Sequence, residues 1–235
     1  FATWMGNKVV HTLHPEFRSD LASLASTHRA MNQDSLTSAR SIRQPILSNH
    51  DIKNAFDIIT YVKGGAVLSM FEHWMGPDTF REGIRRYLRR HRGGTATSSD
   101  LLAALDEVSA QGVTAPFLSF LTQPGVPLLS STGERSVCHD GARRLTLRQE
   151  RYFPFGSDGD RAQTWQVPLC VRHEGGSTCG LLEGPEGHIE LPGCPTWWMP
   201  NEEGAGYFRF SMSEADWDAL RKRGLRQLSD GGTIA

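Results

Sequence analysis

The sequence has almost no net charge and no long hydrophobic run. Its 235 residues include 25 Lys and Arg against 26 Asp and Glu, a formal net charge of −1. A balance this even gives no overall field that would attract nucleic acid or acidic lipid. No apolar run approaches the roughly 20 residues of a membrane-spanning helix, and the N-terminus does not resemble a signal peptide. We therefore expect a folded chain with no nucleic-acid partner and no membrane segment.

The sequence also lacks a C-x-x-C pair, so its four cysteines match no zinc knuckle. All of them lie in the second half, which suits disulfides in an exported protein, although four buried free thiols would fit nearly as well. Gly175-Gly176 predicts a hairpin turn that brings Cys170 and Cys179 to bridging distance. We predict a disulfide there, with Cys138 and Cys194 either paired or free. This slightly favours an extracytoplasmic location and leaves a cytoplasmic one open.

The spacing of apolar residues divides the chain into two halves. Up to about residue 123 the spacing is helical, and the longest helix is expected from about Asp51 to Met75. After Pro124, short β-prone runs alternate with Gly, Pro, Asp and Ser, which predicts a small antiparallel β-sandwich of six or seven strands. The predicted fold class is α+β.

A last helix is expected to begin near the C-terminus. Ser213 and Asp216 have the spacing of a capping box, which predicts a helix running to about Gln227. Residues 230–232 are expected to form an unstructured tail. The predicted division of the chain is therefore 1–125 helical, 126–212 β-sandwich, and 213–235 the start of a further helical domain.

Two other patterns are better explained by ordinary structure than by a site. His11-x-x-His14 has helical spacing for a shared metal, but Pro15 follows directly and no acidic third ligand is evident. The six arginines between residues 81 and 92 have no interleaved aromatic residues on the same face, so they indicate the solvated side of an amphipathic helix.

Paired glycines interrupt the expected long helix beside a tyrosine and a lysine, in Tyr61-Val62-Lys63-Gly64-Gly65. Glycine inside a helix costs about 1 kcal/mol relative to alanine, so a compensating reason is expected. Another backbone could pack closely against this face. Alternatively, the glycines could let the helix approach a catalytic wall on which Tyr61 and Lys63 stand.

The segment around these glycines resembles a known family. Phe56-Asp57-Ile58-Ile59-Thr60-Tyr61-Val62-Lys63-Gly64-Gly65-Ala66-Val67-Leu68 is similar to the tyrosine segment of the aminopeptidase N-type zinc metallopeptidases, a group that includes leukotriene hydrolases. Other stretches resemble that family in the same order, over about residues 1 to 220: Phe1-Ala2-Thr3-Trp4, Asp34-Ser35-Leu36 with Arg43-Gln44-Pro45-Ile46, Gln123-Pro124-Gly125-Val126-Pro127-Leu128, and Asn201 with Gly206-Tyr207-Phe208-Arg209.

The resemblance implies that this chain is an internal fragment of such an enzyme. Residues 1–125 would be the all-helical C-terminal lobe of a thermolysin-like catalytic domain, residues 126–212 its β-sandwich, and residues 213–235 the first helix of a truncated helical domain. The family's H-E-x-x-H pair and its Gly-Ala-Met-Glu-Asn-type loop are absent and would lie upstream of Phe1, as would the third zinc-ligand Glu. Val62 also stands where the family often has Glu, so the resemblance does not carry the family's local substrate contacts over to this position.

The resemblance further implies an activity and one catalytic residue. The parent would remove N-terminal residues from peptides with a free N-terminus, using zinc as cofactor, while the isolated chain would be inactive because it holds no zinc ligand. Tyr61 would donate a hydrogen bond to the oxyanion, and Lys63 and the glycines would serve packing. The alternative is a non-catalytic relative that acts as a protein-interaction scaffold, against which the retained Tyr61 argues.

Overall fold

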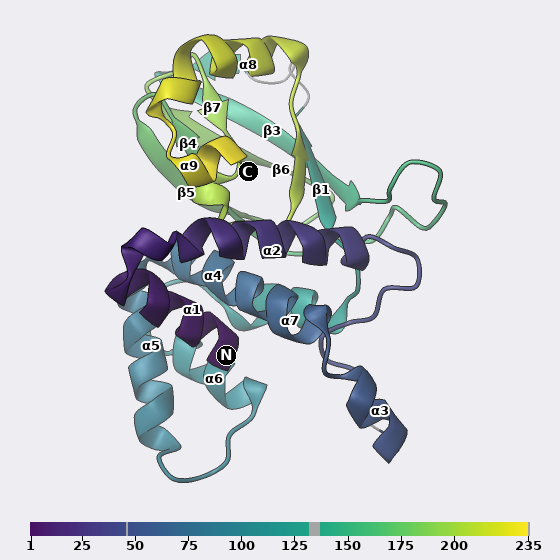
Figure 1. The fold of residues 1–235 in the computed structure, drawn as a ribbon. Coiled ribbons are helices and arrows are strands. Elements are labelled where there is room, and N and C mark those ends of the chain that lie inside the picture. Colours follow the sequence, from purple (N-terminus) through teal and green to yellow (C-terminus); the bar gives the residue numbers. More distant parts are fainter. Residues whose placement is uncertain (46, 132–136, 235) are drawn as a thin grey trace.

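Helices fill the first half of the chain and strands most of the second, which confirms the α+β class. The computed structural model describes residues 1–45, 47–131 and 137–234. In Figure 1 the helical half lies below the sheets, and α2 runs along the boundary between them. The helices of this half are α1 (Ala2–Leu13), α2 (Ser19–Asp34), α3 (Asn49–Asn54), α4 (Gly64–Met75), α5 (Pro77–Arg90), α6 (Ser98–Asp106) and α7 (Thr114–Thr122).

The prediction of a single helix from Asp51 to Met75 is wrong, because the helix is interrupted between Asn54 and Ile58. The Asp57 carboxylate accepts a hydrogen bond from the backbone N–H of Thr60 at 3.0 Å, as an N-cap residue does. Arg40 fixes this carboxylate in place through a 2.5 Å ion pair. The helix therefore restarts after Asp57, and its first turn, Ile59–Lys63, is a wide π-helical turn that leads into α4.

Apolar side chains between the helices form the core of this half. Val67, Phe71 and Phe80 are fully or nearly fully buried, and Trp4 of α1 packs edge-on against the ring of Phe80. Helices α5 and α6 approach closely at Gly83, where a Cβ would lie 2.7 Å from a methyl carbon of Leu105. A side chain at this position would displace the buried Leu105 side chain and crowd the α5–α6 contact.

The strands form two sheets. One contains β2, β3, β1 and β8 in that order, with β6 also paired to β3, and the other has the order β5-β4-β7. The strands are β1 (Pro127–Ser131), β2 (Val137–His139), β3 (Ala142–Arg151), β4 (Val167–His173), β5 (Gly176–Leu182), β6 (Glu186–Pro192), β7 (Trp198–Met199) and β8 (Arg209–Ser211).

One strand pair departs from the expected antiparallel sandwich. The pair β1 and β8 is parallel, with Leu129 opposite Phe210. The chain passes through six other strands between them, and a long connection of this kind is what a parallel pair requires. The remaining pairs are antiparallel.

All four cysteines are paired. The predicted bridge between Cys170 and Cys179 is confirmed, since the two residues lie directly opposite each other in the β4–β5 hairpin with a Cα–Cα distance of 4.0 Å. Cys138 and Cys194, whose state the sequence left open, form the second bridge at a Cα–Cα distance of 5.6 Å.

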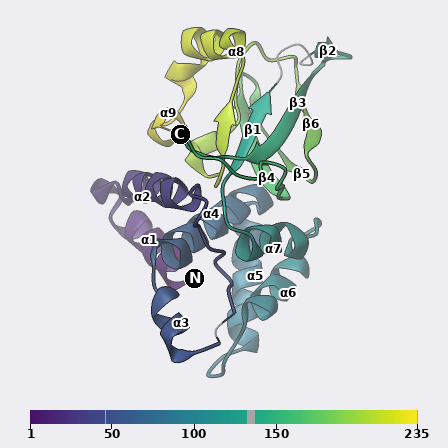
Figure 2. The ribbon, with the colours of Figure 1, turned by 90° about the vertical axis from the view of Figure 1, so that its right-hand side faces the viewer.

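The C-terminal segment folds back onto both halves. The Ser213 hydroxyl accepts a hydrogen bond from the backbone N–H of Asp216, which confirms the predicted cap of α8 (Glu214–Ala219). The expected unstructured tail is wrong, because Asp230–Ile234 forms the short helix α9. Figure 2 shows α9 and the C-terminus beside α2. Asp230 lies 2.7 Å from Arg18 at the start of α2, so an ion pair joins this end of the chain to the helical half.

No helix in the described part of the chain is both long enough and apolar enough to span a membrane.

Candidate functional site around Tyr61

Tyr61 lies in the middle of the π-helical turn and faces outward. Its side chain is 44% exposed, and its ring centroid lies 6.2 Å from that of Phe56. Its backbone N–H donates to the carbonyl of Asp57 at 3.1 Å. Among the residues that the structure describes, none makes a hydrogen bond with the Tyr61 hydroxyl. The phenol is therefore free to donate to a group outside these residues.

Lys63, two residues later in the same turn, points the opposite way. Its side chain is completely buried, and its ammonium nitrogen lies 2.8 Å from Oδ2 of Asp34, which is also fully buried. The same nitrogen donates to the carbonyls of Gln123 at 3.1 Å and Gly125 at 3.5 Å. The inner face of the turn is thus fixed by an ion pair while the outer face presents Tyr61.

Asp34 joins this turn to the sandwich. The backbone N–H of Gly125 donates to Asp34 Oδ1 at 2.9 Å, and the Tyr207 hydroxyl donates to Oδ2 at 3.2 Å. The ammonium group of Lys63 also lies 5.6 Å from the centre of the Tyr207 ring. We call Asp34, Lys63, Gly125 and Tyr207 the buried node.

The buried node brings together segments that are far apart in the sequence. Each of its four members belongs to a different stretch that resembles the aminopeptidase family, and Asp34 is 173 positions from Tyr207. Sequence reasoning assigned Lys63 to packing, and it missed Asp34 and Tyr207 entirely. The available signal was that an Asp, a Lys and a Tyr each sit inside a matched stretch although none of the three was given a chemical role.

Burial controls the ionisation of two members of the buried node. Burial lowers the pKa of the Lys63 ammonium, and the Asp34 carboxylate opposes this by stabilising the positive charge. Burial and the negative charge of Asp34 raise the pKa of Tyr207 well above its ordinary value of 10.0. The Tyr207 phenol therefore stays protonated and remains a donor to Asp34.

The Tyr207→Phe variant is expected to be about 1.5–3 kcal/mol less stable at neutral pH, because Asp34 loses a charge-assisted hydrogen bond. The folded-state pKa of Tyr207 is raised above its unfolded value, so its contribution is complete below about pH 10 and is lost as pH rises through the folded pKa. Urea unfolding from pH 8 to 11 should show the gap narrowing above pH 10. A gap that stays constant with pH would contradict this role of Tyr207.

Close packing does not explain the paired glycines within the described residues. A Cβ at Gly65 would lie 3.9 Å from the backbone nitrogen of Trp4, an ordinary contact, and a Cβ at Gly64 would meet nothing within 4 Å. The first of the two accounts, close packing of another described backbone, therefore does not explain why glycine stands at these two positions. The other account placed both Tyr61 and Lys63 on a catalytic wall. It is wrong for Lys63, which is completely buried, and stays a prediction for the exposed Tyr61.

The two sequence patterns that were not expected to form sites, the His11/His14 pair and the arginine run, are ordinary surface features. His11 lies 3.9 Å from Asp20, while His14 lies beyond the end of α1 and contacts Glu16 at 3.0 Å, so the two rings do not converge. Four of the arginines of α5 pair with carboxylates, among them Arg90 with Glu107 at 2.9 Å. This matches the predicted solvated helix face.

An open groove lies beside the interruption between α3 and the π-helical turn. Arg40, Asp57 and Ile59 line it together with Gln33, Leu36, Ser38, Ala39, Gln44, Pro45, Asp51 and Lys53. Within the described residues, one group of three side chains has metal-ligand spacing. None of the three lines this groove, and Tyr61 is not among them. In the part of the chain that the structure describes, Tyr61 is thus a free donor two positions after the groove residue Ile59, and no group of three metal-ligand side chains lies beside it.

Comparison with known proteins assigns this chain to a family. The model of the Peptidase family M1 domain matches residues 1–120, a span that contains Asp34, Tyr61 and Lys63.

Curated relatives match over nearly the whole chain. Aminopeptidase 2, mitochondrial, from Saccharomyces cerevisiae is 30% identical over 225 residues, covering 94% of this chain and 23% of the relative. Tricorn protease-interacting factor F2 from Thermoplasma acidophilum is 30% identical over 224 residues, covering 94% of this chain and 27% of the relative. Leucyl aminopeptidase from Saccharolobus solfataricus is 29% identical over 184 residues, covering 78% of this chain and 22% of the relative. The chain spans about a quarter of the length of these relatives.

Proposed function

Because this chain belongs to peptidase family M1, we propose that it is part of a zinc-dependent aminopeptidase that removes N-terminal residues from peptides. The observation that carries the proposal is the orientation of Tyr61. Its hydroxyl is exposed and without a partner among the described residues, whereas the turn that holds it is fixed from behind by Lys63 and Asp34. A donor whose backbone is fixed before the reaction suits oxyanion stabilisation, which needs preorganised donors.

The residues that the structure describes do not fit a catalytic zinc site. The sequence contains no H-E-x-x-H, and no metal-ligand group of the described residues includes a neighbour of Tyr61. The zinc ligands of the proposed enzyme, and its general base, therefore have to come from outside these 235 residues. Zinc bound there would lower the pKa of a water molecule and polarise the scissile carbonyl.

The part of the reaction that this chain supplies is hydrogen-bond donation. We propose that the Tyr61 phenol donates to the carbonyl oxygen as it becomes an oxyanion in the tetrahedral intermediate. The bond strengthens only when negative charge develops on that oxygen, so it lowers the barrier more than it tightens substrate binding. Lys63 takes no part in the chemistry, because its ammonium group is completely buried against Asp34.

The proposed placement of the chain within the enzyme follows the family resemblance. Residues 1–125 would form the helical C-terminal lobe of a thermolysin-like catalytic domain, residues 126–212 the β-sandwich, and residues 213–235 the start of a helical domain. The substrates would be peptides with a free N-terminus. The two disulfides support an exported protein.

The proposal is tested by assaying the full-length protein that contains this chain. With zinc bound, it should hydrolyse aminoacyl anilides but not their N-acetylated counterparts, and a strong chelator should abolish the activity. The isolated chain, with its disulfides intact, should hydrolyse neither substrate. A zinc-loaded full-length protein inactive on a panel of free-amine substrates would instead support the protein-interaction scaffold.

A further inference from the structure

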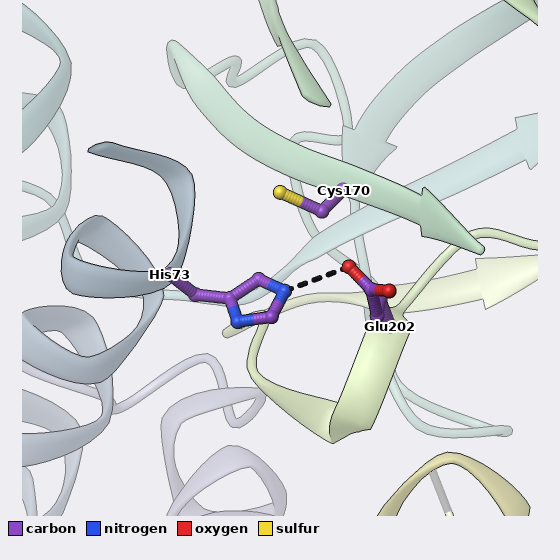
Figure 3. Close-up of side chains that lie close together, drawn as sticks. All are labelled: His73, Cys170 and Glu202. Atoms are coloured by element: carbon purple, nitrogen blue, oxygen red, sulfur yellow. Dashed lines mark hydrogen bonds and ion pairs between the residues drawn. The ribbon is translucent and has the colours of Figure 1, made fainter. Parts of the chain in front are cut away.

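Three potential metal ligands converge where the helical half meets the sandwich (Figure 3). They are His73 in the last turn of α4, Cys170 in the middle of β4, and Glu202 at the start of the short 3-10 helix Glu202–Gly204 after β7. Their ligand atoms all lie within 4.8 Å of one another. His73 Nε2 and Glu202 Oε2 are already 3.0 Å apart. The three side chains therefore come from separate elements: His73 and Glu202 point toward each other, and the Cys170 sulfur lies beside their contact.

The surroundings of these side chains suit a small bound ion. Cys170 is 5% exposed, and all three residues line a cavity of about 10 Å³, which is room for one water-sized particle. The Ser177 hydroxyl donates a hydrogen bond to Glu202, and Asn201 fixes the adjacent loop by accepting from the backbone N–H of Gly206 at 2.7 Å. Supporting hydrogen bonds of this kind orient the side chains that hold a metal.

The disulfide controls whether the third ligand is available. The Cys170 sulfur is bonded to that of Cys179, and a disulfide sulfur is a poor metal ligand because the thiolate is the form that binds metal. When the disulfide is reduced, Cys170 is freed beside a carboxylate and an imidazole. Cys179, directly opposite across the hairpin, then becomes a second thiol at the same place.

The spacing of the ligand atoms is close to that of a tetrahedral zinc site. Zinc bonds of about 2.0–2.3 Å at tetrahedral angles put neighbouring ligand atoms roughly 3.3–3.7 Å apart. The nitrogen and oxygen of His73 and Glu202 need to separate by only a few tenths of an ångström from their 3.0 Å contact. The sulfur needs to move inward by about 1 Å at most, which a rotation of the freed Cys170 side chain can supply.

We propose that His73, Cys170 and Glu202 form a redox-gated zinc site, closed by the Cys170–Cys179 disulfide and opened by its reduction. A dithiol reductant donates two electrons and two protons to the disulfide, leaving two cysteine thiols and becoming a disulfide itself. Zinc then binds to the Cys170 sulfur as its thiol proton passes to solvent. The fourth position is filled by water, or by Cys179, which then also releases its thiol proton to solvent. The mixed sulfur, nitrogen and oxygen ligand set favours Zn²⁺ over Mg²⁺ or Ca²⁺.

The two states would hold the same part of the fold in different ways. The disulfide joins only the neighbouring strands β4 and β5. The metal would instead join α4 to β4 and to the short 3-10 helix that holds Glu202, and so would clamp the helical half to the sandwich. A chain in a reducing compartment, including a newly made chain before export, would thus have a substitute for the missing bridge.

The test uses the Cys179→Ser variant, which frees Cys170 without reductant and leaves the Cys138–Cys194 disulfide intact. Cobalt(II) serves as the spectroscopic probe for zinc. The variant should bind one cobalt per chain with a sulfur-to-cobalt charge-transfer band, and zinc should displace it. The disulfide-bonded wild-type protein should give no such band. Adding His73→Ala to the variant should weaken binding at least tenfold, whereas adding the exposed His11→Ala should leave it unchanged.

A second measurement decides the matter should the Cys179→Ser variant fold poorly. In a Cys138→Ser/Cys194→Ser background, a phosphine reductant converts the remaining disulfide to two thiols by transferring the oxygen of water to phosphorus. Zinc should then raise the melting temperature of the reduced protein and not that of the oxidised one. Cobalt binding that survives His73→Ala, or a melting temperature insensitive to zinc after reduction, would overturn the proposal.

Discussion

The Lys63→Met variant is expected to lose about 3–5 kcal/mol of unfolding free energy, the cost of removing one partner from a buried ion pair. The Asp34 carboxylate is fully buried and would keep only the donors from Gly125 and Tyr207. Methionine fills much of the same volume, so the loss comes from the unpaired charge rather than from a cavity. Urea unfolding monitored by circular dichroism gives the free energy directly.

Two further variants isolate the ion pair as the cause. Lys53→Met removes an exposed lysine from α3 and should change stability by less than about 0.5 kcal/mol. Adding Asp34→Asn to Lys63→Met removes the unpaired charge as well, so the double variant should cost less than the sum of the two single changes. A Lys63→Met protein as stable as Lys53→Met would mean that the buried node does not hold the two halves together.

Much of the local structure could be predicted because its causes lie close together in the sequence. The cap of α8 needs only Ser213 and Asp216, three positions apart. The Cys170–Cys179 bridge needs only a hairpin around Gly175-Gly176. Interactions between residues so close in the sequence can be predicted without knowing the fold.

The errors arose where a distant residue decides the local structure. The expected long helix breaks at Asp57 because Arg40, 17 positions earlier, holds its carboxylate in a capping position. The tail was expected to be unstructured, but Arg18 fixes Asp230 from 212 positions away. Helix periodicity contains no information about such partners.

The candidate site divides in the same way. The segment containing Tyr61 could be found from its own residues and their resemblance to a family. The support behind it could not, because Asp34 and Tyr207 meet Lys63 only once the helical half and the sandwich are assembled. An isolated Asp or Tyr in a sequence is typical of many surface positions, so nothing local marks these two as buried partners.

The Tyr61→Phe variant of the full-length enzyme is expected to lose about 10²–10³-fold in kcat, or roughly 3–4 kcal/mol of transition-state stabilisation. The substitution keeps the ring near Phe56 and removes only a hydroxyl that has no partner among the described residues. The fold should therefore be intact. KM should change much less than kcat, since the neutral carbonyl of the bound substrate needs the donor less than the oxyanion does.

A matched control distinguishes a catalytic role of the Tyr61 hydroxyl from a general effect of replacing any tyrosine by phenylalanine. Tyr87→Phe removes a hydroxyl from α5, where the ring packs against those of Phe1 and His91 at centroid distances of 6.2 and 5.5 Å. This variant should retain full kcat. Equal losses in the two variants would indicate a general effect of the substitution on the enzyme rather than a role for Tyr61.

The most direct test of the account is kcat for an aminoacyl anilide, measured on zinc-loaded full-length Tyr61→Phe alongside its zinc content and melting temperature. The account predicts a kcat lowered about 10²–10³-fold with unchanged zinc content and an unchanged melting temperature, because Tyr61 is a donor and not a metal ligand or a core residue. A kcat within about threefold of the unmodified enzyme, at normal zinc and normal stability, would contradict it.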